Sequence, residues 1–518
     1  MLDLGTSFLA SVSRDPKAVA IVDGDVRLTY QDWYAKISAL VLSFDRLQLA
    51  PGDHLVTVLQ NRWEAATLHW ACQFAGVVIT PINWRSKAHE IDHAVEDCGA
   101  KAIVFEQVSA ENVGESAASR SLARISVGPK CAPAEAGFAE LLGAGSAAAP
   151  RADADALSLM LYTSGTTARP KGVPRRHRAE RAAAIAHVAQ NLYAHGERTL
   201  GVMPLYHTMG VRSLLAMSLI GGRFVCLPRF DVAGALHLIE NEKITNLYLV
   251  PTLYHDLVHH EAFADTDVSS VRKLGFAGAP MTDALLTTLD KAFRPELFVN
   301  HYGSSEIYTF TINQDASRKP GSAGRAGINQ MIRIVRLGAR NVDEIAVPGE
   351  EGEIAALASG DEAFEGYWQR PEANAKAFRQ GWYMTGDTGY ADADGDIYVT
   401  GRVDDMIISG GENVSPVEIE SCLSLHPAVA EVAVVGLPDE RLGKVVAAFI
   451  QRRREVADAE LDAHCRTSGL ANFKRPRRYV FVREIPKSPV GKLLRRQLVA
   501  GDYQAEPAPV SMASKRKA

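Results

Sequence analysis

The strongest constraint on the fold is a regular alternation of short apolar runs with amphipathic helical stretches. Residues 54–59 are typical of a strand, residues 64–74 of a helix and residues 76–80 of the next strand. Repeated strand–helix–strand units build parallel sheets with helices on both faces. The same pattern predicts a helix from Ala88 and further strands at 102–105, 157–161, 199–204, 223–227, 245–250 and 273–276.

The N-terminal segment has a different pattern. Residues 18–22 and 28–30 are apolar and flank Asp23-Gly24-Asp25, which predicts a β-hairpin. Thr29 follows this hairpin and is placed to cap a helix over residues 30–47.

Later segments change the pattern again. Residues 321–397 contain short strand-like runs separated by turns, which predicts a small antiparallel β subdomain. Beyond Gly401 we expect mixed α+β structure, with helices over 416–423 and 458–465 and strands over 429–437 and 444–450. The chain is therefore expected to be of the α/β class, with a large N-terminal domain of parallel sheets plus this subdomain, followed by a small α+β domain.

Charge and cysteine content narrow the function classes. The net charge of −5 is mild, but from residue 405 onward 18 Lys/Arg stand against 14 Asp/Glu, which favours a surface for anions or solvated helix faces. None of the six cysteines forms a CxxC pair, so we expect reduced thiols rather than zinc or redox motifs. The N-terminus has no signal-peptide pattern and no run reaches membrane-spanning length, so a cytoplasmic location without membrane contact is expected.

One loop has the composition of a phosphate-binding site. Residues 162–172 read YTSGTTARPKG, with four Ser/Thr hydroxyls, two glycines and a lysine between a predicted strand and a predicted helix. Small side chains let backbone N–H groups approach an anion, hydroxyls donate to it, and lysine adds positive charge.

This loop resembles the phosphate loop of the adenylate-forming superfamily, which includes acyl-CoA synthetases, peptide-synthetase adenylation domains and firefly-type luciferases. Ala168 stands where that family usually has glycine, and alanine resists a positive φ. The resemblance implies that ATP phosphates are bound by Thr163, Ser164, Gly165, Thr166, Thr167 and Lys171.

A second motif, residues 204–210, resembles the family segment whose histidine lies beside the acyl pocket, which implies a catalytic role for His207. Arg212 follows this motif, and we expect it to face outward; facing the pocket, it would suit a dicarboxylate such as malonate. By resemblance the acid pocket is lined by Ala186, His207, Thr208, Met209, Tyr248, Ala277, Gly278, Tyr308 and Thr309.

Three further motifs resemble the family's nucleotide contacts. The turn at 275–280 implies adenine against the backbone, the segment 301–306 implies stacking, phosphate and Mg²⁺ contacts, and the strand 382–387 implies a ribose contact. Ser305 stands where threonine is commoner. A carboxylate beside phosphates needs a cation between them, which fits Mg²⁺. The implied residues are Gly278, Ala279, Pro280, Tyr302, Gly303, Ser304, Ser305, Asp387 and, as catalytic metal ligand, Glu306.

The C-terminal motifs complete the resemblance. Residues 401–413 resemble the family hinge, with Arg402 on ribose or phosphate and Asp404 at the pivot, while Gly410 and Gly411 border the pantetheine channel. Residues 486–492 resemble the family's catalytic-lysine motif, in which Lys492 neutralises charge at the α-phosphate. Arg475 and Arg85 are the implied CoA contacts.

The resemblance covers nearly the whole chain and implies a large adenylation domain over 1–402, a small mobile domain over 403–504 and a disordered tail over 505–518. It implies a two-step reaction in which a carboxylic acid and ATP give acyl-AMP, and CoA then takes the acyl group. The basic residues of the small domain are therefore assigned to ATP and CoA rather than nucleic acid. A homodimer and modification of Lys492 by a lysine acetyltransferase are further family-based expectations.

The acid is expected to be aromatic, because the chain most resembles bacterial aryl-CoA ligases of the 4-halobenzoate type, especially at residues 401–413 and 473–476. Medium-chain fatty acids, malonate-like acids and another acyl acceptor stay open as alternatives. A catalytically inactive binding protein is less favoured, since Glu306, Asp387, Arg402 and Lys492 are all present.

Overall fold

The computed structural model describes residues 2–143, 147–163, 169–403, 405–410, 412–487 and 493–506. These residues form two compact units. Unit 1 is Met1–Ile345, Ala355–Thr385 and Ala393–Ile397, and unit 2 is Ala346–Ile354, Gly386–Asp392 and Tyr398–Ala518. Each unit is described by itself. The predicted division at 402/403 stays a prediction.

Unit 1 contains a seven-stranded sheet in the order β7-β6-β5-β3-β4-β8-β9. Neighbouring strands are parallel except for the β8–β9 hairpin. Its strands are β3 (His54–Val58), β4 (Val78–Pro81), β5 (Ala102–Glu106), β6 (Ala123–Val127), β7 (Ala136–Gly137), β8 (Leu157–Thr163) and β9 (Lys171–Arg176). Every residue of β3, β4 and β5 is buried, as expected for strands covered on both faces.

Part of a second, larger sheet runs in the order β16-β15-β14-β13-β12-β10-β11-β1-β2. Pairing is parallel from β14 to β1, and the strands at either end are antiparallel. The strands are β1 (Val19–Asp23), β2 (Val26–Thr29), β10 (Arg198–Gly201), β11 (Arg223–Cys226), β12 (Asn246–Leu249), β13 (Lys273–Phe276), β14 (Leu297–Tyr302), β15 (Thr311–Asn313) and β16 (Ser322–Ala326). The predicted N-terminal hairpin and the parallel strands are confirmed.

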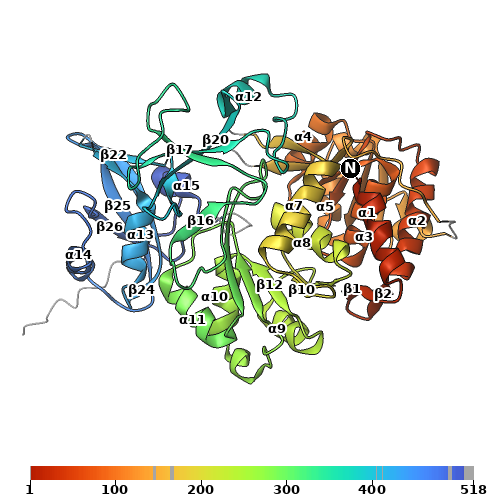
Figure 1. Ribbon diagram of the computed structural model, residues 1–518, viewed down its shortest axis with the longest axis horizontal. Coiled ribbons are helices and arrows are strands. Elements are labelled where there is room, and N and C mark those ends of the chain that lie inside the picture. Colours follow the sequence, from red (N-terminus) through yellow and green to blue (C-terminus); the bar gives the residue numbers. More distant parts are fainter. Residues whose placement is uncertain are drawn as a thin grey trace, which may run out of the picture. The chain divides into compact units, whose positions relative to one another are not determined.

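Helices cover these sheets. Helices α1, α2, α3, α7 and α8 lie close together, as do α9, α10 and α11 beside β12 (Figure 1). Thr29 caps α2 in a capping box with Asp32, as the sequence predicts. The helices are α1 (Leu4–Arg14), α2 (Tyr30–Arg46), α3 (Trp63–Ala75), α4 (Ala88–Cys98), α5 (Ala110–Glu115), α6 (Phe138–Leu141), α7 (His177–Gln190), α8 (Thr208–Leu219), α9 (Val232–Asn241), α10 (Pro251–His259), α11 (Asp283–Phe293) and α12 (Pro371–Ala377).

The predicted antiparallel segment forms β17 (Ile332–Arg336), β18 (Gly352–Leu357), β19 (Phe378–Arg379), β20 (Trp382–Ala391) and β21 (Ile397–Arg402). The boundary between the compact units falls within β18, β20 and β21, so this segment is not a unit of its own.

The C-terminal part of unit 2 is a sheet in the order β23-β22-β25-β24, with β26 also on β25. Helices α13 and α15 pack against β24. The elements are β22 (Ile407–Ser409), β23 (Glu412–Val414), α13 (Pro416–Ser424), β24 (Val429–Asp439), β25 (Gly443–Arg452), α14 (Asp458–Thr467), β26 (Arg478–Phe481) and α15 (Arg495–Ala500). The predicted helices and strands of this part are confirmed.

The prediction that the chain is disordered from residue 505 starts the tail too early. Ala505 bridges to Val482, and the Glu506 N–H donates to the Phe481 carbonyl, so both residues are held by backbone bonds. The rest of the tail, 507–518, lies outside the described residues.

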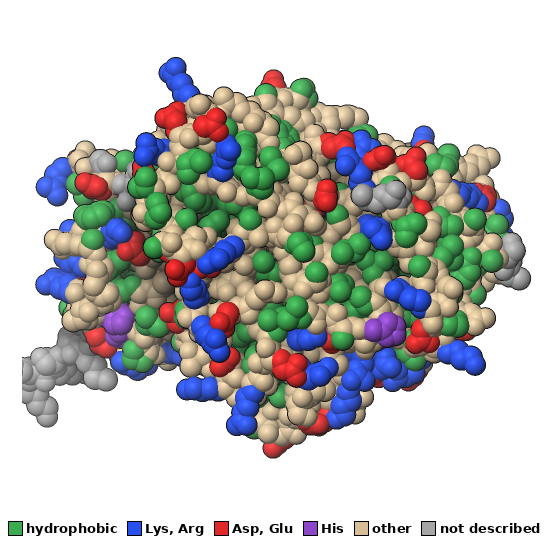
Figure 2. Space-filling model, in the orientation of Figure 1, with side chains coloured by type: hydrophobic (Ala, Val, Ile, Leu, Met, Phe, Trp, Pro, Cys, Tyr) green, Lys and Arg blue, Asp and Glu red, His purple; other side chains and the backbone are tan. Residues whose placement is uncertain are grey.

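Two surface properties bear on the sequence expectations. None of the described helices is long and apolar enough to cross a bilayer. Acidic and basic side chains are interspersed over the face in Figure 2, so that face carries no extended field of one sign.

Candidate functional site

The phosphate-loop motif lies at a β-hairpin in unit 1. Thr163 ends β8 and pairs with Lys171 at the start of β9. The loop therefore joins two antiparallel strands, and the expectation of a strand followed by a helix is wrong. Lys171 Nζ lies 4.6 Å from the centre of the Tyr367 ring. The predicted loop residues Ser164, Gly165, Thr166 and Thr167, with Ala168, lie outside the described residues.

The second nucleotide motif follows β14, which ends at Tyr302. A β-carbon on Gly303 would lie 2.0 Å from the Tyr308 carbonyl oxygen, so only glycine fits this turn. Ser304 N–H donates to the Ile307 carbonyl at 2.9 Å, and Ser304 Oγ accepts from Glu306 N–H at 3.2 Å. These bonds hold the turn that carries Ser305 and Glu306.

Glu306 is buried, and Tyr367 OH donates to its Oε1 at 2.8 Å. Among the described residues no hydrogen bond uses the other carboxylate oxygen. Glu306 can therefore offer one oxygen to a cation while Tyr367 holds the other.

The predicted adenine turn follows β13. Gly278 has φ +86°, a left-handed conformation that favours glycine, and a β-carbon there would lie 3.3 Å from Val250 Cγ1. Ala277 is buried before it, and Ala279 and Pro280 continue the turn.

His207 is the N-cap residue of α8. Its Nδ1 accepts a bond from Met209 N–H at 3.4 Å, so the imidazole closes the first turn of the helix. Thr208 and Met209 are buried in that turn, and Ala186 is buried on α7. The described structure thus gives His207 a capping role, and its predicted catalytic role is not tested by this bond.

Arg212 lies one turn further along α8 and is 2% exposed, so the expectation that it faces outward is wrong. Its Nη1 donates to Thr309 Oγ1 at 2.7 Å and to the Tyr308 carbonyl at 3.2 Å. Its Nη2 donates to Tyr248 OH. This guanidinium therefore contacts three of the nine predicted acid-pocket residues: Tyr248 from β12, and Tyr308 and Thr309 from the segment after Glu306.

A second buried arginine, which no sequence motif marks, lies beside this group. Arg175, on β9, donates from Nε to Glu180 Oε1 at 2.7 Å, and neither side chain is exposed. Tyr308 OH donates to Glu180 Oε2 at 3.0 Å. Arg175 Nη1 also donates to the Glu306 and Glu362 carbonyls at 2.9 and 2.7 Å, which joins this network to the turn that carries Glu306. The basic run 175–178 was the available sequence signal.

Two buried histidines lie against the Tyr248 ring, and the sequence motifs assign neither of them a role. The rings of His187 and His301 lie 4.7 and 5.0 Å from that of Tyr248. Asn191 joins them, because His301 Nε2 lies 3.1 Å from its Oδ1 and His187 Nδ1 lies 2.9 Å from its Nδ2. Burial, together with the nearby Arg212 charge, holds the pKa of both histidines well below the ordinary value, so both are neutral at pH 7.

The predicted ribose contacts lie together in unit 2. Arg402 Nη1 donates to Asp387 Oδ1 at 2.7 Å. Gly386 has φ +73°, and a β-carbon on it would lie 2.8 Å from Arg402 Nη2. The glycine before the aspartate therefore lets the guanidinium approach, and one ion pair presents both groups predicted to contact the nucleotide.

The remaining predicted residues are less fully described. Gly410 has φ +60° in the tight β22–β23 turn, which by itself accounts for a glycine there. Arg475 donates to Asp462 Oδ1 at 2.6 Å and to Asn472, so CoA would have to compete with these partners. Arg85 lies over the Trp84 ring at 3.7 Å. The predicted Asp404, Gly411 and Lys492 lie outside the described residues.

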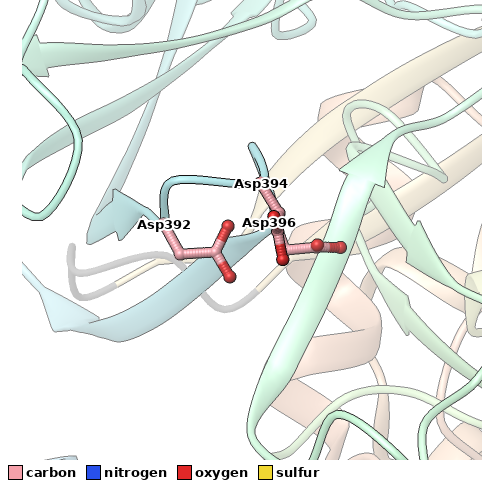
Figure 3. A group of neighbouring side chains, drawn as sticks. All are labelled: Asp392, Asp394 and Asp396. Carbon is pink, nitrogen blue, oxygen red and sulfur yellow. The ribbon is translucent and has the colours of Figure 1, made fainter.

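An acidic cluster on the β20–β21 turn is a separate feature. Figure 3 shows the carboxylates of Asp392, Asp394 and Asp396 on this turn. Lys319 Nζ lies 3.0 and 2.5 Å from Asp394 and Asp396. A lysine therefore already balances part of this negative charge, and we assign the cluster no ligand.

The chain is similar over most of its length to proteins of one known family. Family models for the AMP-binding enzyme and for the AMP-binding enzyme C-terminal domain match residues 8–368 and 418–492. A 4-chlorobenzoate–CoA ligase of Arthrobacter sp is 34% identical over 503 residues, covering 94% of this chain and 93% of that protein. A long-chain-fatty-acid–CoA ligase of Mycobacterium tuberculosis is 31% identical over 507 residues, covering 96% and 97%.

Among solved structures, an anthranilate CoA ligase in complex with anthranoyl-AMP matches with a TM-score of 0.90 and 25% identity, covering 97% of each chain. The sequence motifs, the fold and both family models agree over most of the length. The chain therefore belongs to the AMP-binding enzyme family, the adenylate-forming enzymes.

Proposed function

We propose that this chain joins an aromatic carboxylic acid to CoA. The acid and ATP form acyl-AMP and release pyrophosphate, and the CoA thiol then takes the acyl group and releases AMP. The enzyme is an AMP-forming acyl-CoA synthetase by its family and its relatives. The main support for the acid site is that three predicted pocket residues, Tyr248, Tyr308 and Thr309, all accept hydrogen bonds from the buried Arg212 side chain of α8.

The aromatic class of substrate rests on two supports. The predicted pocket includes Tyr248 and Tyr308, whose rings offer flat apolar faces, and the small side chain of Ala186 on α7. The 4-chlorobenzoate and anthranilate ligases act, by their names, on aromatic acids. The fatty-acid ligase keeps a long-chain acid as the second candidate.

Each unit carries predicted nucleotide contacts of its own. In unit 1, the β8–β9 loop with Thr163 and Lys171 holds the phosphates, and Glu306 offers a carboxylate oxygen to Mg²⁺. Bound Mg²⁺ supplies positive charge to the phosphates. In unit 2, Asp387 and Arg402 take the ribose.

The C-terminal motifs supply the remaining roles. Lys492 neutralises the charge formed as the carboxylate attacks the α-phosphate, and Asp404 is the pivot for moving the small domain between the two steps. Gly410 and Gly411 border the thiol channel, with Arg475 and Arg85 on CoA phosphates. These roles rest on the sequence motifs.

The decisive experiment separates the two half-reactions. Acid-dependent ATP–pyrophosphate exchange without CoA is expected, followed by thioester formation when CoA is added. Lys492→Ala should abolish exchange but keep thioester formation from supplied acyl-AMP. Lys444→Ala, at an exposed lysine of the same unit, is the control and should keep both. Exchange without any thioester would refute the CoA ligase, and equal loss of both half-reactions in Lys492→Ala would refute the role of that lysine.

Two finer proposals concern assembly and regulation. A homodimer is tested by light scattering, where a monomeric mass at micromolar concentration would exclude it. Acetylation of Lys492 is tested by mass spectrometry of the protein from its native cells, where an unmodified lysine under every growth condition would exclude it.

A further inference from the structure

Arg212 is a buried cation with no carboxylate in contact. Among the described residues no Asp or Glu oxygen lies within 4.0 Å of its guanidinium. Arg175 is equally buried and has Glu180 at 2.7 Å. A buried charge is expensive to desolvate unless an opposite charge compensates it. The contrast between these two arginines therefore points to a missing anion beside Arg212.

The hydrogen bonds of Arg212 leave two of its donors unused. A guanidinium has five N–H donors, and the three bonds to Tyr308, Thr309 and Tyr248 use two on Nη1 and one on Nη2. Nε is buried without a partner among the described residues. Nε–H and the second Nη2–H remain, and together they form a fork that can hold one carboxylate through two bonds.

The neighbouring groups also offer donors. His187 Nδ1 accepts from the Asn191 amide, which leaves the proton on Nε2, and that buried atom has no partner among the described residues. Tyr248 OH accepts from Arg212 and keeps its own proton to donate. Arg212, His187 and Tyr248 therefore each have an unused hydrogen-bond donor that suits an anion near the predicted acid pocket.

The charged groups packed around Arg212 do not supply that anion. Glu180 is committed to Arg175 and Tyr308. Glu362 makes no direct hydrogen bond to Arg212, although its charge attracts the guanidinium, and its Oε1 accepts from Asn329 at 3.1 Å. Burial raises the pKa of Glu362, which disfavours its charged form.

The reacting carboxylate of the substrate does not fill this role either. It loses its charge when it becomes the mixed anhydride with AMP, whereas the buried guanidinium stays charged throughout. The counter-charge therefore has to remain ionised in both the acid and the acyl-adenylate.

We propose that Arg212 is a specificity-determining residue that binds a second carboxylate of the substrate, with Tyr248 OH and His187 Nε2 as further donors. The preferred substrate is then a dicarboxylic acid, of which one carboxylate is activated and the other is held on α8. This inference rests on the proposed acid–CoA ligase activity and narrows its substrate class.

The test compares acids of equal shape that differ in charge. A nitro group matches a carboxylate in shape but is neutral, so the pairs are 2-, 3- and 4-nitrobenzoate with the three benzenedicarboxylates. Glutarate and 4-nitrobutanoate form an aliphatic pair. The measurement is kcat/KM for each acid in ATP–pyrophosphate exchange. In the wild type at least one dicarboxylate should exceed its nitro partner by about tenfold or more, because a charge-assisted bidentate contact is lost in the partner.

Variants connect that preference to the residue. Arg212→Met should remove or reverse the preference by roughly 10- to 100-fold, and Arg212→Lys, which keeps the charge and loses the fork, should give an intermediate ratio. Arg272→Met replaces an arginine that is 51% exposed and should leave the ratio unchanged. Folding is checked by thermal melting and by MgATP binding.

Each outcome decides one question. If no acid supports exchange in the wild type, the proposed function fails. If exchange occurs but every nitro analogue is used as well as its dicarboxylate, the inference about Arg212 fails even if Arg212→Met does not fold. An unchanged ratio in folded Arg212→Met also overturns it.

Discussion

The buried pair Arg175–Glu180 allows a prediction whose size follows from the structure. Arg175→Met removes a fully buried guanidinium and leaves the Glu180 carboxylate without its ion-pair partner. Losing one partner of a buried pair costs about 3–5 kcal/mol. Two backbone carbonyls, of Glu306 and Glu362, also lose a donor, which adds about 1–3 kcal/mol each.

The charge part of this cost has a ceiling. A buried carboxylate without a partner can lose its charge by binding a proton. For a glutamic acid with the ordinary pKa of about 4.3, this protonation costs about 4 kcal/mol at pH 7 and about 1.6 kcal/mol at pH 5.5. The destabilisation by Arg175→Met should therefore shrink by about 2 kcal/mol as the pH falls between these values. Arg175→Met/Glu180→Leu removes the charge and should be more stable than the single variant by about 3 kcal/mol at pH 7.

The assay is urea unfolding followed by tryptophan fluorescence. All six tryptophans lie in the residues of unit 1, so their emission reports the unit that holds this pair. Arg178→Met is the control, because its ion pairs with Asp155 at 2.9 Å and with Glu365 at 2.7 Å are exposed and should each contribute less than about 1 kcal/mol. A double variant less stable than Arg175→Met, or a penalty that does not change with pH, would refute the reasoning.

Three other predictions test the site and the core. Gly303→Ala should prevent unit 1 from folding correctly and abolish pyrophosphate exchange, because its β-carbon would lie 2.0 Å from a carbonyl oxygen, whereas Gly114→Ala, with 3.8 Å to its nearest neighbour, should remain soluble and active. Asp387→Ala should raise KM for ATP roughly 10- to 100-fold, as expected for a lost charged hydrogen bond, while Glu440→Ala at an exposed carboxylate of unit 2 leaves KM unchanged. Burial lowers the pKa of His54 to about 4, so stability is lost as the pH falls from about 6.5 toward 4, by about 3 kcal/mol for this group. His54→Asn should flatten that part of the pH–stability curve in thermal melting, and an unchanged slope would contradict the assignment.

Much of the fold could be predicted because buried parallel strands leave a plain signal in the sequence. Strands β3, β5 and β13 begin and end within about one residue of their predicted positions, since a strand covered on both faces is a continuous apolar run. Strand β9 could not be predicted this way. It contains Pro174 and three basic residues, and it forms because it lies at the sheet edge and pairs with β8.

Short sequence motifs indicate most of the candidate site residues, but they do not indicate residues such as Arg212, whose position depends on which helix faces are buried. Arg212 was expected to face outward, as charged residues of amphipathic helices do. Helix α8 has no such exposed face, because Thr208–Ser218 is buried throughout, so a charged residue there must find partners inside. Glu362 and His301 come from segments far apart in the chain, and only the folded structure brings such residues to one network.

The shared partners of the buried arginines have a consequence for laboratory evolution. Tyr308 bonds to Arg212 through its carbonyl and to Glu180 through its hydroxyl, and Glu180 in turn bonds to Arg175. Effects of substitutions within one such network are not additive. A library that changes these positions one at a time will mostly recover unstable proteins, whereas simultaneous substitution of the connected positions can replace the whole set of contacts. A single substitution such as Arg212→Met can change the preference among acids, but a stable enzyme for a new substrate class should need compensating changes at the connected positions.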